Sequence, residues 1–189
     1  MDYSANSRLD YLYDLLIENY STIKEELILL INNPANIENT NKFASLLCKL
    51  DAREFINPLL QQISIAHKED CWLIDYLYAA GNLLEQCSAE ESFDIPDTIF
   101  DKLKDWLLNN QNELAWNTAV ILKHYASEEA EKIQLQKLEQ DDFFLTHYEC
   151  ILGLLNYNRP KHIKQVEQIA LDENRNRNLR ELCESLLRK

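Results

Sequence analysis

The fold is decided by the stretch Ala119-Val-Ile-Leu122 … Ser127-Glu-Glu-Ala130 … Leu135-x-x-Leu138 … Asp141. A related stretch follows 31 positions later: Cys150-Ile-Leu-Gly153 … Val166-x-x-Ile169 … Asp172. Each contains two apolar segments with helical spacing, separated by a short polar turn. A period of about 20 to 50 residues in helix pairs predicts a solenoid, in which each pair buries its apolar side against its neighbours. The chain is therefore expected to offer a binding surface, and no cleft.

The composition also predicts an all-α protein. Only two glycines and four prolines occur in 189 residues, far fewer than the turns of a sheet protein need. Hydrophobic residues make up 46% and charged residues 27%, as is typical of a folded globular chain. This length suits one domain with a sizeable core.

Apolar spacing and helix-start signals place helices along the whole chain. Thr22-x-x-Glu25 and Asp51-x-x-Glu54 read as capping boxes, and Ser127 is a favoured N-cap. Pro58 is expected to kink its helix or to mark the start of the regular part. The expected helices are Ser7–Tyr20, Thr22–Asn32, Asn39–Leu50, Ala52–Ala66, Asp70–Leu84, Pro96–Leu108, Asn112–His124, Ser127–Glu139, Asp142–Tyr157, Pro160–Leu171 and Asn174–Leu187.

These helices form one domain, 1–189, with three parts. Capping helices occupy 1–37, helix-pair repeats occupy 38–171 with an insertion at 85–95, and a capping helix occupies 172–189. Both glycines, Gly81 and Gly153, lie inside first helices, each five residues after a tyrosine. A glycine inside a helix costs roughly 1 kcal/mol against alanine, so we expect a close approach between helices at both positions.

The units 117–141 and 148–172, and less regularly 43–70, resemble short HEAT-like repeats of about 30 residues. That family has an apolar first helix, a tight turn, a second helix of the form x-x-Leu-x-x-Leu, and often a following acidic residue, here Asp141 and Asp172. The resemblance covers about two thirds of the chain and leaves out 1–37 and the insertion. It implies a right-handed α-solenoid of stacked antiparallel helix pairs whose second helices line the concave face. It implies no catalytic residues.

The charge restricts the partner. A formal net charge of −13 at pH 7 disfavours nucleic acid or an anionic membrane as the main partner and suits a basic protein. Basic residues near the C-terminus resemble a nucleic-acid-binding patch, but five such residues are weak support for that function in a chain with a net charge of −13. They are Arg175, Arg177, Arg180, Arg188 and Lys189. The five cysteines are scattered and do not suggest a disulfide framework. No apolar run approaches the roughly 20 residues that cross a bilayer, and the N-terminus has no features of a secretory leader. We therefore expect a cytoplasmic protein.

The candidate partner-binding residues are mostly acidic. Asp97, Asp101 and Asp105 follow at i, i+4 and i+8 on one face of the helix expected at 96–108. Like charges at this spacing destabilise a helix by about 0.2–0.5 kcal/mol per pair, which a basic partner would explain. The alternative is a solvated polar face next to Lys102 and Lys104. Three further acidic residues precede this helix and join the candidate site: Glu90, Glu91 and Asp94.

Aromatic residues supply one more candidate. Trp72 and Trp116 are expected in the core, where aromatic side chains contribute much of the packing. Phe143 and Phe144 are adjacent, so both cannot point inward from one helix. We therefore include Phe143 in the partner-binding site as an exposed hot-spot candidate.

No catalytic, metal or cofactor site is predicted. His147-x-x-Cys150 and His67-x-x-x-Cys71 have ligand-like spacing, but each is isolated, whereas zinc takes four ligands. The two helical glycines provide neither a phosphate-binding loop nor a nucleophile elbow.

The leading hypothesis is a non-catalytic, cytoplasmic protein-interaction module whose acidic surface binds a basic protein. A dedicated inhibitor, such as a bacterial immunity or antitoxin-type protein against a cationic toxin, and a general scaffold share every feature above. The alternative is a HEAT-like enzyme acting on nucleic acid, similar to a DNA glycosylase, or a lyase-type protein. A basic concave face, or Trp72 or Trp116 exposed beside Asp75, would favour that alternative.

Overall fold

The computed structural model describes residues 15, 18–50, 52–87, 97–140 and 143–188. Within these ranges the chain is all-α, with no strand. Two 3-10 turns, Pro34–Asn36 and Arg53–Phe55, precede α3 and α4 respectively. The helices are α2 (Tyr20–Ile31), α3 (Thr40–Leu50), α4 (Ile56–Ile65), α5 (Leu73–Glu85), α6 (Asp97–Asn109), α7 (Asn112–Leu122), α8 (Glu128–Leu138), α9 (Phe144–Leu171) and α10 (Arg177–Leu187).

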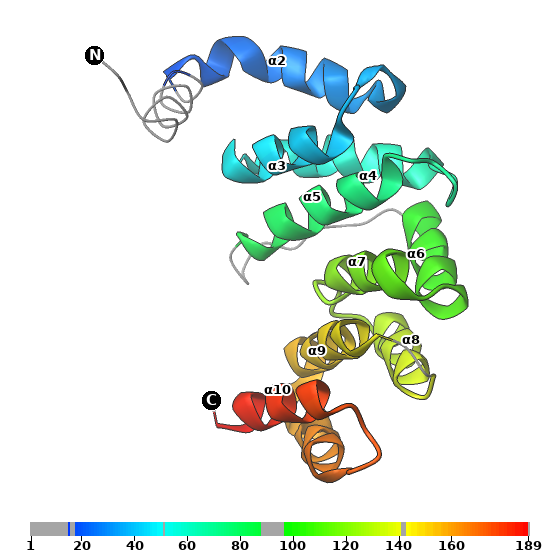
Figure 1. Cartoon of the computed structure of the whole chain (residues 1–189). Helices are drawn as coiled ribbons and strands as arrows, with labels where there is room; N and C mark the ends of the chain where they lie inside the picture. The colour runs from blue at the N-terminus through cyan, green and yellow to red at the C-terminus, as the bar shows by residue number, and fades with distance from the viewer. Residues whose placement is uncertain (1–14, 16–17, 51, 88–96, 141–142, 189) are drawn as a thin grey trace.

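The helices follow one another along a curve (Figure 1). One row is formed by α3, α5, α7 and α9, each packed on the next, and a second by α4, α6 and α8. Figure 1 shows α6 and α8 on the outer side of the curve and α7 and α9 on the inner side. The resemblance implied that second helices line the concave face, and this is wrong for α6 and α8. Which row lies inside depends on the tilt between successive pairs, which the apolar spacing does not determine.

Apolar side chains from every helix contribute to a core that runs the length of the stack. Phe55, Leu47 and Tyr76 are among the fully buried side chains. Trp72 is buried as predicted, whereas Trp116 is half-buried. Each fully buried large apolar side chain stabilises the fold by about 1.5–3 kcal/mol. Because this core is shared between helices, the fold depends on the contacts between neighbouring helices. None of the helices in the described ranges is long and apolar enough to cross a membrane.

Two helix starts test the predicted caps. Ser127 caps α8 as predicted, since its Oγ accepts a hydrogen bond from the Ala130 amide at 3.1 Å. The capping box at Thr22 is wrong, because α2 already begins at Tyr20. The amides of Thr22 and Ile23 donate to the Asn19 carbonyl, so a helical turn already satisfies the donors that a cap would serve.

Pro58 lies in the first turn of α4, which begins at Ile56. Of the two predicted outcomes, Pro58 therefore marks the start of the regular helix, where a missing amide donor costs little. Asp51, the residue expected to cap this helix, lies outside the described residues.

A break inside α9 matches the predicted boundary between the last two helices of the repeats. Asn158 has non-helical angles, φ −155° and ψ 81°, two residues before Pro160. The Asn158 side chain accepts a hydrogen bond from the Lys161 amide at 3.1 Å, as an N-cap does. The segment therefore consists of two helical arms joined at Asn158. Most of the predicted first helix, Ser7–Tyr20, lies outside the described residues.

The predicted close approach at both glycines is confirmed. A Cβ added to Gly81 would lie 2.7 Å from Cγ1 of Val120 on α7. A Cβ added to Gly153 would lie 2.7 Å from Cδ of Gln134, a buried side chain of α8. Neither position has room for a methyl group unless its neighbour moves.

Three basic side chains donate hydrogen bonds to backbone carbonyls at the C-terminal ends of neighbouring helices. Lys102 donates to the Ala66 carbonyl at the end of α4 (2.6 Å), and Lys137 donates to the Asn110 carbonyl after α6 (2.9 Å). Arg175 donates in the same way to the Leu138 carbonyl at the end of α8 (2.9 Å). We call these three the cation–carbonyl contacts. A cation at a helix C-terminus satisfies carbonyls that have no partner within their own helix and offsets the negative end of the helix dipole.

Candidate interaction surfaces

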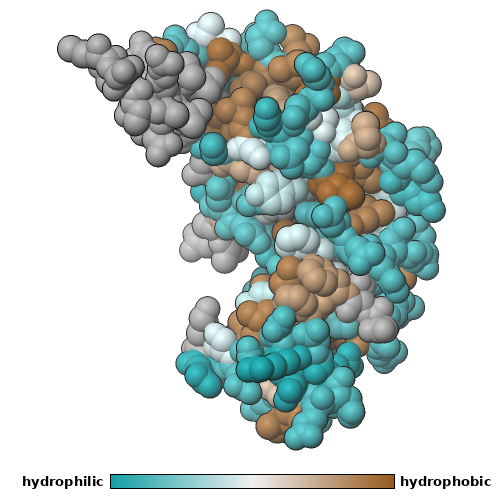
Figure 2. Space-filling view, in the orientation of Figure 1, coloured by the Kyte–Doolittle hydropathy of each residue, from teal (hydrophilic) through white to brown (hydrophobic). Residues whose placement is uncertain are grey.

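The predicted acidic site falls on α6. Asp101 and Asp105 are both exposed, on the side of α6 opposite the buried Leu103 and Leu107. Asp97 is the first residue of α6, and its side chain is outside what the structure describes. Three more predicted residues also lie outside the described residues: Glu90, Glu91 and Asp94. Figure 2 shows hydrophilic residues along the outer edge of the curve, where Figure 1 places α6 and α8.

The lysines beside these carboxylates make contacts elsewhere. Lys102 directs its Nζ to the Ala66 carbonyl and lies 5.9 Å from the centre of the Trp106 ring. Lys104 reaches across to α8, where its Nζ is 3.8 Å from Glu129 Oε1. Asp105 accepts a hydrogen bond from the Asn109 amide group at 2.6 Å. Within the described residues, neither of these lysines forms an ion pair with Asp101 or Asp105.

One more exposed carboxylate extends this face onto α8. Glu129 lies in the first turn of α8, and its Oε1 is 3.8 Å from the Nζ of Lys104 on α6. We call Asp101, Asp105 and Glu129 the α6–α8 acidic surface. It includes more carboxylates than ammonium groups, even with the half-buried Lys104 and the exposed Lys132 counted beside it. Acidic residues in a first turn also stabilise the helix through its dipole, so Glu129 has a structural role as well.

Phe143 lies in an aromatic cluster. Its ring centre is 5.0 Å from that of Phe144 and 6.2 Å from that of Trp116 on α7, both with edge-on geometry. Phe143 is 39% exposed, while Phe144 packs against the core. The prediction that only one of the two rings points inward is therefore confirmed. The structure places Phe143 against Trp116 of α7, a helix of the inner row, and its part in binding stays a prediction.

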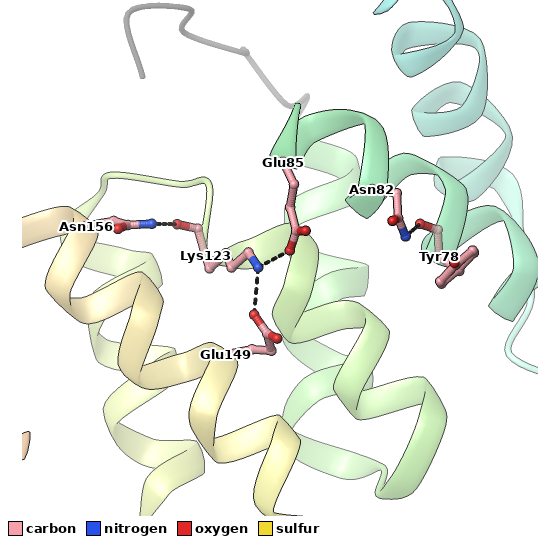
Figure 3. A network of polar contacts seen from close by, with 6 residues as sticks. All are labelled: Tyr78, Asn82, Glu85, Lys123, Glu149 and Asn156. Carbon is pink, nitrogen blue, oxygen red and sulfur yellow. Dashed lines mark hydrogen bonds and ion pairs between the residues drawn. The ribbon is translucent and has the colours of Figure 1, made fainter. Parts of the chain in front are cut away.

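Sequence reasoning missed a buried ion-pair cluster that joins three helices (Figure 3). Lys123, just after α7, donates to Glu85 at the end of α5 and, at 2.7 Å, to Glu149 on α9. The Lys123 side chain is 8% exposed and that of Glu149 is 12% exposed, while Glu85 is about half exposed. The Asn156 amide group donates to the Lys123 carbonyl at 3.4 Å. The ends of α5 and α7 and the side of α9 therefore meet at one ammonium group.

Burial alone would lower the pKa of Lys123, but the hydrogen bonds and charges of Glu149 and Glu85 outweigh that effect and raise it. Lys123 is therefore a fixed positive charge that holds two carboxylates. The pKa of the neighbouring His124 shifts in the opposite direction. Burial, assisted by the charge of Lys123, lowers the pKa of His124 to about 4, although the Glu85 carboxylate opposes the shift.

This histidine predicts a pH dependence of stability. In the unfolded chain His124 binds a proton as the pH falls below its ordinary pKa of 6.5, whereas in the folded protein it stays neutral down to about pH 4. The free energy of unfolding should therefore fall by about 2 kcal/mol as the pH drops through this window. Urea titrations at pH 7, 5.5 and 4.5 measure it. His124→Gln should flatten the profile relative to the wild type, and the exposed His67→Gln should leave it unchanged. Equal slopes in all three proteins would contradict the assignment to His124.

The arrangement that would favour an enzyme is not found at Trp72. Trp72 is buried with its ring edge-on to Tyr76, at 4.9 Å between ring centres. The Asp75 carboxylate accepts hydrogen bonds from Thr40 and Asn41 of α3. Asp75 is therefore held between two helices and does not lie beside an exposed tryptophan ring at position 72.

Several cations of the basic tail are engaged within the protein. Arg175 donates to the Leu138 carbonyl, Arg177 pairs with Glu181 at 2.7 Å, and Arg188 lies 3.6 Å from Glu184. A pocket of about 300 Å³ opens beside Arg175, between the turns before α9 and α10. In the described part of the chain, no three His, Cys, Asp or Glu side chains form a group suited to a metal ion.

Comparison of the chain with protein-family models, curated proteins and solved structures finds no match. The functional argument therefore rests on the surfaces described above.

Proposed function

We propose that this protein is a non-catalytic interaction module that binds a basic protein through the α6–α8 acidic surface. The observation that carries the proposal is the different placement of the charges on α6. Asp101 and Asp105 face solvent, whereas Lys102 turns inward to the Ala66 carbonyl. Repulsion between the two aspartates costs about 0.2–0.5 kcal/mol, and a cationic partner would reverse that cost on binding. The same field would accelerate association.

The architecture we propose is a HEAT-like, right-handed α-solenoid of stacked antiparallel pairs. It is supported by the 31-residue period, by the row-wise packing of alternate helices and by the glycines at close contacts. Such a stack presents an extended surface and suits protein recognition. The scattered cysteines support a reducing, cytoplasmic location.

Within this class, a dedicated inhibitor is the form that we favour for testing. A bacterial immunity or antitoxin-type protein needs to cover a cationic toxin with complementary charge, and the net charge of −13 suits that role. A general scaffold would use the same surface. The two differ in stoichiometry, because an inhibitor binds one basic protein tightly and a scaffold binds several.

The test is affinity capture of the tagged protein from its native lysate at low and moderate salt. The variant Asp97→Asn/Asp101→Asn/Asp105→Asn is compared with Glu25→Gln/Glu26→Gln/Glu38→Gln, which removes three exposed carboxylates elsewhere. We expect one stoichiometric basic protein, retained by the Gln control and bound about tenfold more weakly by the Asn variant. The proposal fails if nucleic acid is recovered instead, or if capture is the same with both variants.

A further inference from the structure

A row of pockets follows the turns at which α6, α8 and α9 end. The first pocket, of about 650 Å³, lies at the turn after α6. The second, of about 300 Å³, lies before α10, and the third, of about 350 Å³, lies beside the ends of α8 and α9. Gln140 lines both the first and the second pocket, while Glu139, Asp172 and Arg175 line both the second and the third. The pockets therefore adjoin, and we call the row the turn groove.

Hydrogen bonds between the turns hold the walls of the turn groove in place. Lys137, which is 1% exposed, donates to the Asn110 carbonyl at 2.9 Å and to the side-chain oxygen of Gln140 at 3.1 Å. Arg175 joins the next two turns through the Leu138 carbonyl. A partner therefore meets walls that are already ordered, which lowers the entropy cost of binding.

Side-chain amides are the main polar groups of the turn groove. Among the described residues that line it, Asn and Gln outnumber the charged residues. Two of these amides use their oxygen within the protein. Gln140 accepts from Lys137, and Asn176 accepts from the backbone amide of Asn178 at 2.9 Å. The NH₂ groups of Gln140 and Asn176 therefore remain as donors in the lining.

Two other amides of the turn groove use their opposite end. The side chain of Asn109 donates to Asp105 at 2.6 Å, and that of Asn174 donates to Asp172 at 3.1 Å. The side-chain oxygens of Asn109 and Asn174 therefore remain as acceptors in the lining. The row thus offers both kinds of hydrogen-bonding group to a ligand.

Charge is nearly balanced along the turn groove. Its described lining includes the carboxylates of Glu139 and Asp172. Arg175 lies 3.7 Å from Asp172, and Lys137 adds a second cation that is bonded to the lining. Recognition here would therefore depend on neutral hydrogen bonds, in contrast to the α6–α8 acidic surface.

We infer that the turn groove binds an extended peptide segment of a protein partner through the main chain of that segment. An extended main chain presents N–H and C=O groups in alternation, and side-chain amides can pair with both. Alternate side chains of the segment would enter the pockets and provide specificity.

The length of the turn groove suits such a segment. Packed helices lie about 8–10 Å apart, so the two steps from α6 through α8 to α9 span about 16–20 Å. That span corresponds to about five or six extended residues at about 3.3 Å each. The inference rests on the proposed function as a protein-interaction module, but it places this contact at the turns and requires no basic partner.

The probe is a phage library of linear random heptapeptides that lack Asp, Glu, Lys and Arg, selected on the immobilised full-length protein. We expect a common sequence to be enriched. Anisotropy with the labelled synthetic peptide gives its affinity, and ¹⁵N spectra should show the largest shifts at the Gln140 and Asn176 side-chain amides. The same peptide with N-methyl groups on alternate main-chain nitrogens should bind about tenfold more weakly, because each methyl group removes a donor.

Gln140→Glu is the decisive variant. The carboxylate keeps an acceptor for Lys137 and removes the NH₂ donor, so folding should be retained and peptide binding should weaken about tenfold. Gln136→Glu adds the same charge at an exposed position of α8 and should bind the peptide as the wild type does. The inference is overturned if no sequence is enriched, if the N-methylated peptide binds as tightly, or if the two variants bind alike.

Asp101→Asn/Glu129→Gln separates this inference from the α6–α8 acidic surface. We expect this variant to bind the uncharged peptide as tightly as the wild type does. Weakening by this variant alone overturns the turn groove and leaves the proposed function standing. Weakening by Gln140→Glu alone supports the turn groove, and affinity capture then tests the α6–α8 acidic surface separately.

Discussion

Lys123→Met is expected to lower the free energy of unfolding by about 3 kcal/mol. Methionine keeps most of the side-chain volume, so the loss comes from charge and not from a cavity. Without the ammonium group, Glu149 is a carboxylate that is 12% exposed, with its hydrogen-bond donor at 2.7 Å removed. A buried charge left without its partner is among the costliest changes that one substitution can make. Urea-induced unfolding followed by far-UV circular dichroism measures the effect.

Three further variants isolate the cause. Lys132→Met removes an exposed lysine on α8 and should change stability by less than about 0.5 kcal/mol. Glu85→Gln should cost about 1 kcal/mol or less, because its side chain is about half exposed. Lys123→Met/Glu149→Leu should recover much of the loss, since it removes both buried charges. If the double variant is less stable than Lys123→Met, packing and not charge explains the effect.

Tyr76→Ala is expected to cost about 3–5 kcal/mol. Tyr76 is fully buried, and its hydroxyl donates to the Ile31 carbonyl at the end of α2 at 3.0 Å. Burial raises the pKa of Tyr76, so this donor keeps its proton throughout the neutral range. Truncation leaves a cavity beside Trp72 and an unsatisfied carbonyl 45 residues away along the chain. Differential scanning calorimetry and urea titration measure the loss.

A neighbouring tyrosine provides the matched control. Tyr78 lies on the same helix but is 42% exposed, so Tyr78→Ala should cost less than about 1 kcal/mol. Tyr76→Phe removes only the hydroxyl and should cost about 1–2 kcal/mol, because the Ile31 carbonyl then has no donor. Similar losses for Tyr76→Ala and Tyr78→Ala would show that burial at position 76 is not what stabilises α5 against α2.

Features that depend on neighbouring residues were predictable from the sequence. Helical spacing of apolar residues and the shortage of glycine predict an all-α chain, because both act within a few turns of helix. Ser127 as a cap and the boundary before Pro160 depend on chemistry within about four residues. The exposure of Asp101 and Asp105 follows from their place opposite buried leucines. Thr22 failed as a cap because the preceding turn already satisfies the amides of α2.

Features that depend on distant residues were not predictable. Lys123 ends an apolar stretch, where a basic residue is ordinary at a helix C-terminus. Its two partners are 38 and 26 residues away, so no local pattern could distinguish it from a solvated lysine. The same holds for Lys102, whose acceptor Ala66 is 36 residues away. The one signal in the sequence is a charged residue placed directly after the buried Ile121 and Leu122.

The cation–carbonyl contacts have a consequence for how the stack opens. A row of stacked helices commonly opens first at its ends, because the last helix has neighbours on one side only. Here Arg175 joins the segment before α10 to the end of α8, and Arg159 donates to the Leu186 carbonyl in the last turn of α10 at 2.8 Å. Opening the C-terminal segment must break contacts made with α8 and α9. Amide hydrogen exchange should therefore remain slow into α10, and the described helices should exchange together.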